Sequence, residues 1–323
     1  MTYRSAIKEG FRLINSNWQL VVVKFVAMII NVLLLFVLFL LPVIISVAVI
    51  GIDTEPFQDM RSIPENLSTI VSNYLVLFII AAFFLLVYLL VASVISIYVY
   101  GASAGIIADS IRSASEKFSM RRFFRSGKEL FMPVFGFLAV VLLLVIVVML
   151  IVLLITIALA AFVDYLGQFE SGMSTFISMF LILLSIALML FLITFSLAVI
   201  FYGSAVLVLD RKGAFESTRE AVSYLYRRPA AYWLYCILLG CIILTSVVLT
   251  LIGFAFSEIP VVGAIMYIPF QFFTSVAQSY IGLIVLAAVF IYYRSERLSA
   301  DLSSGSMNTS SPEVLGQDRP HSQ

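Results

Sequence analysis

Few residues of this chain could do covalent or metal chemistry. The only histidine is His321, close to the end of the sequence, and the only cysteines are Cys236 and Cys241. Cysteines five positions apart point to different faces of a helix and lack the spacing of a metal site, so we expect buried free thiols. No Walker, Rossmann or His-Glu-x-x-His pattern occurs. We therefore expect no catalytic residue, no metal and no cofactor, and predict that the protein is not an enzyme.

Carboxylates are almost absent from the apolar parts of the sequence. Asp164 and Asp210 fall at the edges of apolar runs. A pump driven by protons or sodium usually needs a carboxylate inside the membrane, so the pattern disfavours that class. Asp53, Glu55 and Asp59 could together hold a cation, although a solvated acidic loop explains them better.

One polar stripe could line a path for a solute. Its members are Gln271, Thr274, Ser275 and Gln278, which recur at helical spacing and so share one face. Inside a membrane such a stripe usually forms hydrogen bonds to neighbouring helices, and this interpretation is favoured. A pore or a ligand groove is the alternative.

The elements that carry these residues are membrane helices. Hydrophobic residues make up 63% of the 323 positions and charged residues only 11%, against about 25% charged in soluble proteins. A helix needs roughly 20 apolar residues to cross a membrane, and the runs are continuous rather than alternating as barrel strands would be. The sequence predicts an all-α integral membrane protein with six transmembrane helices, at about 19–50, 70–100, 132–162, 176–209, 230–256 and 270–293.

The charges between these runs predict an orientation. Of the 19 lysines and arginines, only Arg61 falls in the first, third or fifth loop. Because Lys and Arg near membrane helices collect on the cytoplasmic side, we expect both termini in the cytoplasm and the protein in the cell (inner) membrane. The basic loops would attract anionic headgroups. Candidate contacts with anionic lipid or a partner are Arg121, Arg122, Arg125, Lys128, Arg227 and Arg228.

An amphipathic segment precedes three of the apolar runs, at 3–18, 118–133 and 214–229. Each ends in a helix breaker, namely Asn15–Asn17, Pro133 and Pro229, and contains a small residue at a matching place, namely Gly10, Gly127 and Ala221. We expect three interfacial helices, each followed by a transmembrane hairpin. The candidate parallel repeats are 1–117, 118–212 and 213–298 within one membrane domain, 1–298. The alternative is that any basic amphipathic helix before a span looks like this.

The ends of the apolar runs also resemble one another. YVYGASAGIIAD (98–109) and IFYGSAVLVLD (200–210) both place Tyr-Gly before small and apolar residues and an Asp. These stretches and REAVSYLYRRPAAYW (219–233) resemble a prokaryotic group that includes the membrane domain of glycerophosphodiester phosphodiesterases and related polytopic membrane proteins. The hydrolytic activity of that family resides in a separate soluble barrel. No such barrel occurs in this sequence, so the resemblance implies no activity.

Two functions remain open. The favoured hypothesis is a non-enzymatic structural or accessory membrane protein that binds anionic lipid, or a cytoplasmic protein partner, through basic interfacial helices. The alternative is a transporter or channel for a lipid-like or small uncharged solute. We expect no nucleic-acid partner, and the sequence does not indicate an oligomeric state. The Ser-rich segment 299–323 has few large apolar residues and predicts a disordered cytoplasmic tail.

Overall fold

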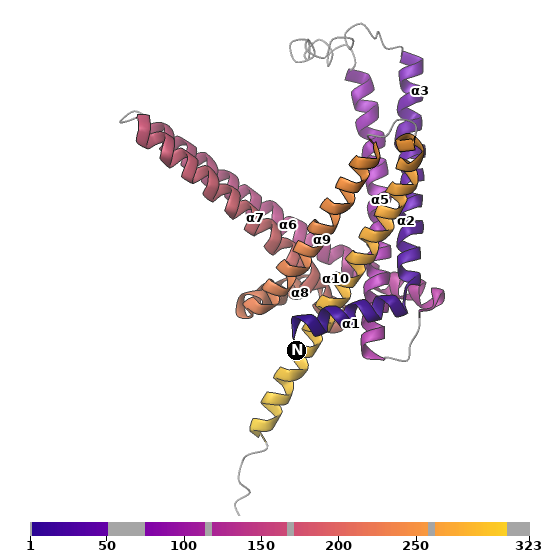
Figure 1. Ribbon diagram of the computed structural model, residues 1–323, viewed down its shortest axis with the longest axis vertical. Coiled ribbons are helices and arrows are strands. Elements are labelled where there is room, and N and C mark those ends of the chain that lie inside the picture. Colours follow the sequence, from indigo (N-terminus) through magenta and orange to yellow (C-terminus); the bar gives the residue numbers. More distant parts are fainter. Residues whose placement is uncertain (1, 51–74, 114–117, 167–170, 258–261, 309–323) are drawn as a thin grey trace, which may run out of the picture.

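The computed structural model describes residues 2–50, 75–113, 118–166, 171–257 and 262–308, and within these ranges the chain is helical without a strand. The elements, labelled in Figure 1, are α1 (Tyr3–Ser16), α2 (Gln19–Leu35), the π-helical η1 (Phe36–Leu40), α3 (Leu41–Ile50), α5 (Leu75–Arg112), α6 (Met120–Leu166), α7 (Ser171–Leu209), α8 (Ala214–Arg227), α9 (Pro229–Ser257) and α10 (Val262–Asn308).

Six helical stretches are long and apolar enough to cross a membrane, which confirms the predicted all-α polytopic fold. They are Gln19–Val49, Leu75–Arg112, Met120–Tyr165, Thr175–Leu209, Pro229–Ala255 and Pro269–Ser299. The first is one helical rod in which η1 lies immediately before Pro42. Pro42 disturbs the helix because a proline cannot donate the backbone hydrogen bond of a regular helix. A single π-helical turn is a common way to absorb such an irregularity.

The spans pair into three hairpins that separate from one another toward one end of the molecule. In Figure 1, α2 and α3 lie beside α5, α6 lies beside α7, and α9 lies beside α10. The α6–α7 hairpin leans away from the other two pairs, and all three converge near α1 and α8. The fold is therefore tightest at one end.

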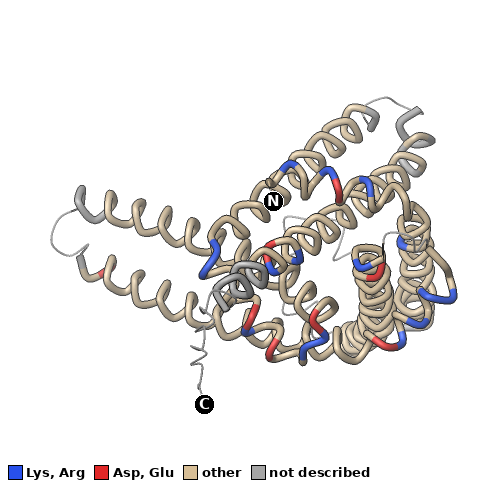
Figure 2. The backbone as a smooth tube through the Cα atoms, turned by 90° about the horizontal axis from the view of Figure 1, so that it is seen from below, with Lys and Arg blue, Asp and Glu red and all other residues tan. Residues whose placement is uncertain are grey.

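The core lies at that end, in the last turns of α5 and α7 and in the second half of α10. Every residue from Gly101 to Ala108 in α5 and from Tyr202 to Val208 in α7 is buried, as are those from Val285 to Tyr293 in α10. These three helices also contact one another. We call this the basic end, because the described lysines and arginines fall at 4–24, 112–128, 211–228 and 294–297, and Figure 2 shows them gathered there.

The three segments predicted to be amphipathic, 3–18, 118–133 and 214–229, hold the three hairpins together. The first part of α6 packs on α5, α8 packs on α7, and α1 packs on α10. Each amphipathic segment thus contacts the second span of the hairpin before it in sequence, and α1 contacts the last hairpin. The contacts form a closed cycle of three.

Small residues permit these contacts, as their positions predicted. A Cβ added at Gly10 would lie 3.0 Å from the backbone nitrogen of Ala288, and one at Gly127 would lie 2.6 Å from the ring of Tyr98. Ala221 is fully buried, and its Cβ would lie 3.5 Å from a Cβ on Gly203. The apolar face of each amphipathic segment is therefore partly occupied by protein.

Two of the three predicted breakers end a helix, and Pro133 does not. α1 ends at Ser16, and α8 ends at Arg227 just before Pro229 begins α9. Pro133 lies inside α6, so the expectation of a separate second amphipathic helix is wrong. A proline removes one hydrogen bond and need not stop a membrane helix whose other turns are held by packing. Here Val134 and Phe137 just beyond it are fully buried.

The end of the described chain also differs from expectation. α10 continues to Asn308, so residues 299–308 are helical rather than disordered. Extending an existing helix costs far less than starting one, because each added residue forms a hydrogen bond on a turn already in place. Residues 309–323 lie outside the described residues.

Candidate functional site

Arginines cap the ends of neighbouring helices at the basic end. The last four carbonyls of a helix have no partner within it, and cations are favoured beside them. Arg112, the last residue of α5, donates from Nη2 to the carbonyl oxygens of Leu209 at 2.7 Å and Val208 at 3.3 Å, at the end of α7. Arg294 of α10 donates in turn to the carbonyl of Ile111 in α5. These bonds tie α5, α7 and α10 together.

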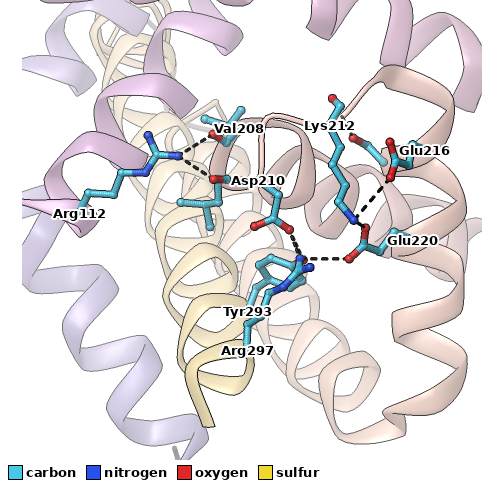
Figure 3. A network of polar contacts seen from close by, with 10 residues as sticks. Arg112, Val208, Asp210, Lys212, Glu216, Glu220, Tyr293 and Arg297 are labelled. Carbon is cyan, nitrogen blue, oxygen red and sulfur yellow. Dashed lines mark hydrogen bonds and ion pairs between the residues drawn. The ribbon is translucent and has the colours of Figure 1, made fainter. Parts of the chain in front are cut away.

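A network of charged side chains surrounds Arg297 of α10 (Figure 3). Its guanidinium pairs with Asp210, which follows α7, and with Glu220 of α8 at 3.0 Å. The hydroxyl of Tyr293 donates to Asp210 at 2.7 Å, and Arg297 also donates to that hydroxyl. The side chains of Asp210 and Glu220 are only 20% and 27% exposed, so Arg297 bridges two carboxylates that are largely withdrawn from water.

Lys212 extends this network along α8. Its ammonium group pairs with Glu220 and lies 3.6 Å from the carboxylate of Glu216. The hydrogen bond to Glu220 raises the pKa of Lys212 above its ordinary value. Asp210, Glu220 and the two cations Lys212 and Arg297 are therefore satisfied by one another, an arrangement that fastens α8 and α10 to the end of α7.

Tyrosines pack beneath the charged network. The ring of Tyr224 in α8 lies 5.2 Å from that of Tyr293 and 5.4 Å from that of Tyr202 in α7, centroid to centroid. The Tyr202 hydroxyl donates to the carbonyl of Ala231 at 2.9 Å, whereas the buried Tyr224 hydroxyl has no hydrogen-bond partner among the described residues. Burial raises the pKa of Tyr224. This aromatic layer joins α7, α8 and α10.

A cavity of about 560 Å³ opens beside the network, between α5, the first part of α6 and the end of α7. Ser126, Pro133 and Leu207 are among its lining residues. It is also lined by five basic and two acidic residues, a formal excess of three positive charges: Arg112, Arg122, Arg125, Arg211 and Lys212, with Asp109 and Glu129.

Arg211 has an unusual backbone at the edge of this cavity. Its φ of 53° is the only positive value among the described residues other than glycine. Arg211 lies two residues beyond the end of α7, at the left-handed position where helices commonly place glycine. A side chain there costs about 1 kcal/mol. Unlike Arg297, Arg211 forms no ion pair within the described ranges.

The predicted lipid contacts divide into exposed and engaged residues. Arg121, Lys128 and Arg227 are exposed. Arg125 is exposed and pairs with Glu129 at 3.3 Å, a surface pair of small energetic value. Two others serve the fold or the cavity: Arg122 is half-buried and lines the cavity, and Arg228 pairs with Glu296 of α10.

The polar stripe lies on α10 away from the basic cavity. Gln271 and Gln278 are exposed, and Thr274 and Ser275 are half-buried. The Ser275 hydroxyl donates to the carbonyl of Gln271 at 2.8 Å, a bond within its own helix. The hydroxyl oxygen of Thr274 is buried without a hydrogen-bond partner in the described part of the chain. The structure therefore brings the four residues onto one face and leaves both interpretations open.

The cysteines differ from expectation, and the acidic residues of the described chain are dispersed. Among the described residues, no three His, Cys, Asp or Glu side chains gather where they could hold a metal ion. Asp53, Glu55, Asp59 and His321 lie outside those residues. Both cysteines are free, but the expectation of burial is wrong for Cys241, which is exposed, and Cys236 is half-buried. A helix side that faces lipid is exposed in the protein without its membrane. A free cysteine behaves as a small apolar residue and is therefore compatible with such a position.

Sequence reasoning did not find the charged network or the cavity. Arg112 and Arg297 served only as indicators of orientation, and Asp210 only as a helix end. A signal was present, because Asp109 and Asp210 both follow the Tyr-Gly pattern at the end of an apolar run. The partners of Asp210 lie 83 and 87 positions away in the chain, so only the tertiary structure identifies them.

Comparison with known proteins finds no matching family model, no matching curated protein and no matching solved structure.

Proposed function

We propose that this multi-pass membrane protein has no enzymatic activity and binds anionic phospholipid headgroups through its basic end. One observation carries the proposal. On the first turns of α6, the basic side chains of Arg121, Arg125 and Lys128 are exposed beside the apolar side chains of Met120 and Phe124, which are 50% and 55% exposed. An exposed surface that combines apolar and basic residues at the start of a membrane span suits the headgroup layer.

The proposed orientation places this surface on the cytoplasmic side of the cell membrane, with both termini there. The support is the charge asymmetry, since all the described lysines and arginines fall in segments at the basic end. The three hairpins and their amphipathic segments are proposed to be parallel repeats. The closed cycle, in which the first part of α6 packs on α5, α8 packs on α7 and α1 packs on α10, supports this proposal.

Lipid retention measured by native mass spectrometry tests the proposal. The protein is extracted from vesicles of equal phosphatidylglycerol and phosphatidylcholine, and we expect phosphatidylglycerol to be enriched among the bound lipids. The triple variant Arg121→Gln, Arg125→Gln, Lys128→Gln should lower this enrichment, because each basic residue contributes about 1 kcal/mol, or roughly fivefold.

A charge-conserving triple variant is the matched control. Arg121→Lys, Arg125→Lys, Lys128→Arg keeps the attraction and should retain the wild-type enrichment. A wild-type protein without preference for the anionic lipid would refute the proposal. A soluble protein that remains bound after the lipids are exchanged, and is lost in the Gln variant, would instead identify a cytoplasmic protein partner.

A second candidate function is passage of a lipid-like or small uncharged solute. It is favoured by an apolar groove of about 440 Å³ between α6 and α7, lined by residues such as Leu138, Val145 and Leu197. If the polar stripe of α10 lines the path of the solute, the double variant Gln271→Leu, Gln278→Leu should abolish solute flux in vesicles. An accessory protein should tolerate the change or become more stable, because both residues are exposed.

A further inference from the structure

The cavity between α5, α6 and α7 differs from the exposed basic surface in how it is built. Three helices contribute to it, and the residues come from positions as far apart as Gly105 and Lys212. Its volume of about 560 Å³ far exceeds that of one water molecule, about 30 Å³. It can therefore enclose a ligand group rather than merely attract one.

The cavity lining has an excess of positive charge, which an anionic ligand would balance. Several of its cations are already engaged, since Arg112 bonds to the end of α7 and Lys212 pairs with Glu216 and Glu220. An arginine has five N–H donors, so a guanidinium that makes one or two bonds retains others. Asp109 and Glu129 reduce the positive charge of the lining, and the formal excess of three that remains is enough to balance a compact dianion.

The backbone of Arg211 and its side chain, unpaired in the part of the chain that the structure describes, are the features that most favour a bound ligand. A glycine at its position would relieve the left-handed backbone, with a φ of 53°, yet the chain has an exposed arginine that forms no ion pair among the described residues. Backbone strain of this kind is concentrated at positions where the residue has a function. Arginine recognises phosphate through paired, charge-assisted hydrogen bonds, and the Ser126 hydroxyl of α6 adds a further possible donor to the lining.

We infer that this cavity is a binding site for a phosphate monoester group, held by Arg211 together with the remaining N–H donors of Arg112. The inference rests on the proposed affinity for anionic headgroups but assigns a specific site, which shares only Arg125 with the exposed basic surface. The phosphate group can belong to a lipid headgroup or to a free phosphate. The cavity lies at the ends of three candidate spans, a depth that both kinds of ligand can reach.

Titration of the full-length protein in a nonionic detergent and a phosphate-free buffer tests the inference. The probes are inorganic phosphate, dioctanoyl phosphatidic acid and dioctanoyl phosphatidylcholine, at constant ionic strength. We expect saturable binding of phosphatidic acid, of inorganic phosphate or of both, and none of phosphatidylcholine. Binding of phosphatidic acid alone identifies a lipid ligand, and equal or tighter binding of inorganic phosphate identifies a free one.

The variant Arg211→Gly separates loss of the site from loss of the fold. Glycine suits the left-handed backbone, so the unliganded variant should have an unchanged or higher Tm. Its affinity for phosphate should fall about tenfold or more, because a charge-assisted hydrogen bond is lost. Arg219→Gln, an exposed position outside the cavity, is the matched control and should bind as the wild type does.

The outcomes distinguish this inference from the general proposal. Absence of saturable binding, or equal binding by the wild type and Arg211→Gly, overturns the phosphate site. In that case enrichment of phosphatidylglycerol by the wild type would still support the exposed surface as a lipid contact. Saturable phosphate binding without such enrichment would support the site and refute the broader proposal.

Discussion

Arg297 is the residue on which the charged network depends. It is shared by Asp210 and Glu220, which come from different parts of the chain and would repel each other without it. Arg297→Gln should lower the free energy of unfolding by about 1–3 kcal/mol, because Asp210 loses its cation and Glu220 keeps only Lys212. Thermal unfolding in detergent measures the loss. Arg219→Gln, an exposed residue of α8, should change little, and an equal effect of both variants would contradict this role.

The stabilising contribution of Lys212 should persist into strongly alkaline solution. Its pKa is raised above the ordinary value of 10.5, chiefly by the hydrogen bond to Glu220. A group whose folded-state pKa is raised contributes fully below its unfolded pKa and loses the contribution as the pH rises through the folded one. The difference in Tm between the wild type and Lys212→Gln should therefore be constant from pH 7 to 9 and shrink only above about pH 10.5. A difference that vanished near neutral pH would show that another group titrates.

At the scale of elements, two glycines that the sequence pairs have unequal roles. A Cβ at Gly203 of α7 would lie 2.5 Å from the ring of Phe137, which is fully buried and cannot move aside. A Cβ at Gly101 of α5 would meet Val134 at 3.5 Å, an ordinary contact. Gly203→Ala should cost about 1–3 kcal/mol through overpacking, and Gly101→Ala should be nearly neutral. Chemical unfolding of the two variants checks this, and equal costs would refute it.

The elements also show what the sequence can and cannot predict. The six spans follow from apolar length alone, so they were predictable. The ends of α1 and α8 were predictable because Asn17 and Pro229 act locally on the chain. The continuation of α6 through Pro133 was not, because it depends on the packing of Phe137 and its neighbours. The cavity likewise needs α5, α6 and α7 together, and its clearest mark, the backbone of Arg211, has no signal in the sequence.

At the scale of the whole molecule, the closed cycle of contacts explains why the core lies at one end. Each amphipathic segment joins two hairpins there, and α1 joins the first to the last through Gly10 and Ala288. No comparable set of segments holds the described parts of the hairpins at the other end, where they separate (Figure 1). The lysines and arginines belong to the same joining segments. One end of the molecule is therefore both the most tightly packed and the most highly charged.

This asymmetry predicts how the molecule lies in the membrane. The basic end should face the cytoplasm, because Lys and Arg near span ends are retained there. Single cysteines at Asp164→Cys near the end of α6 and at Arg227→Cys at the end of α8 report the two sides, since both positions are exposed. The background carries Cys236→Ser and Cys241→Ser. A membrane-impermeant maleimide should label Asp164→Cys in intact cells and Arg227→Cys only after the membrane is opened. The reverse pattern would invert the orientation, and labelling of both in intact cells would show that the charge asymmetry does not control insertion.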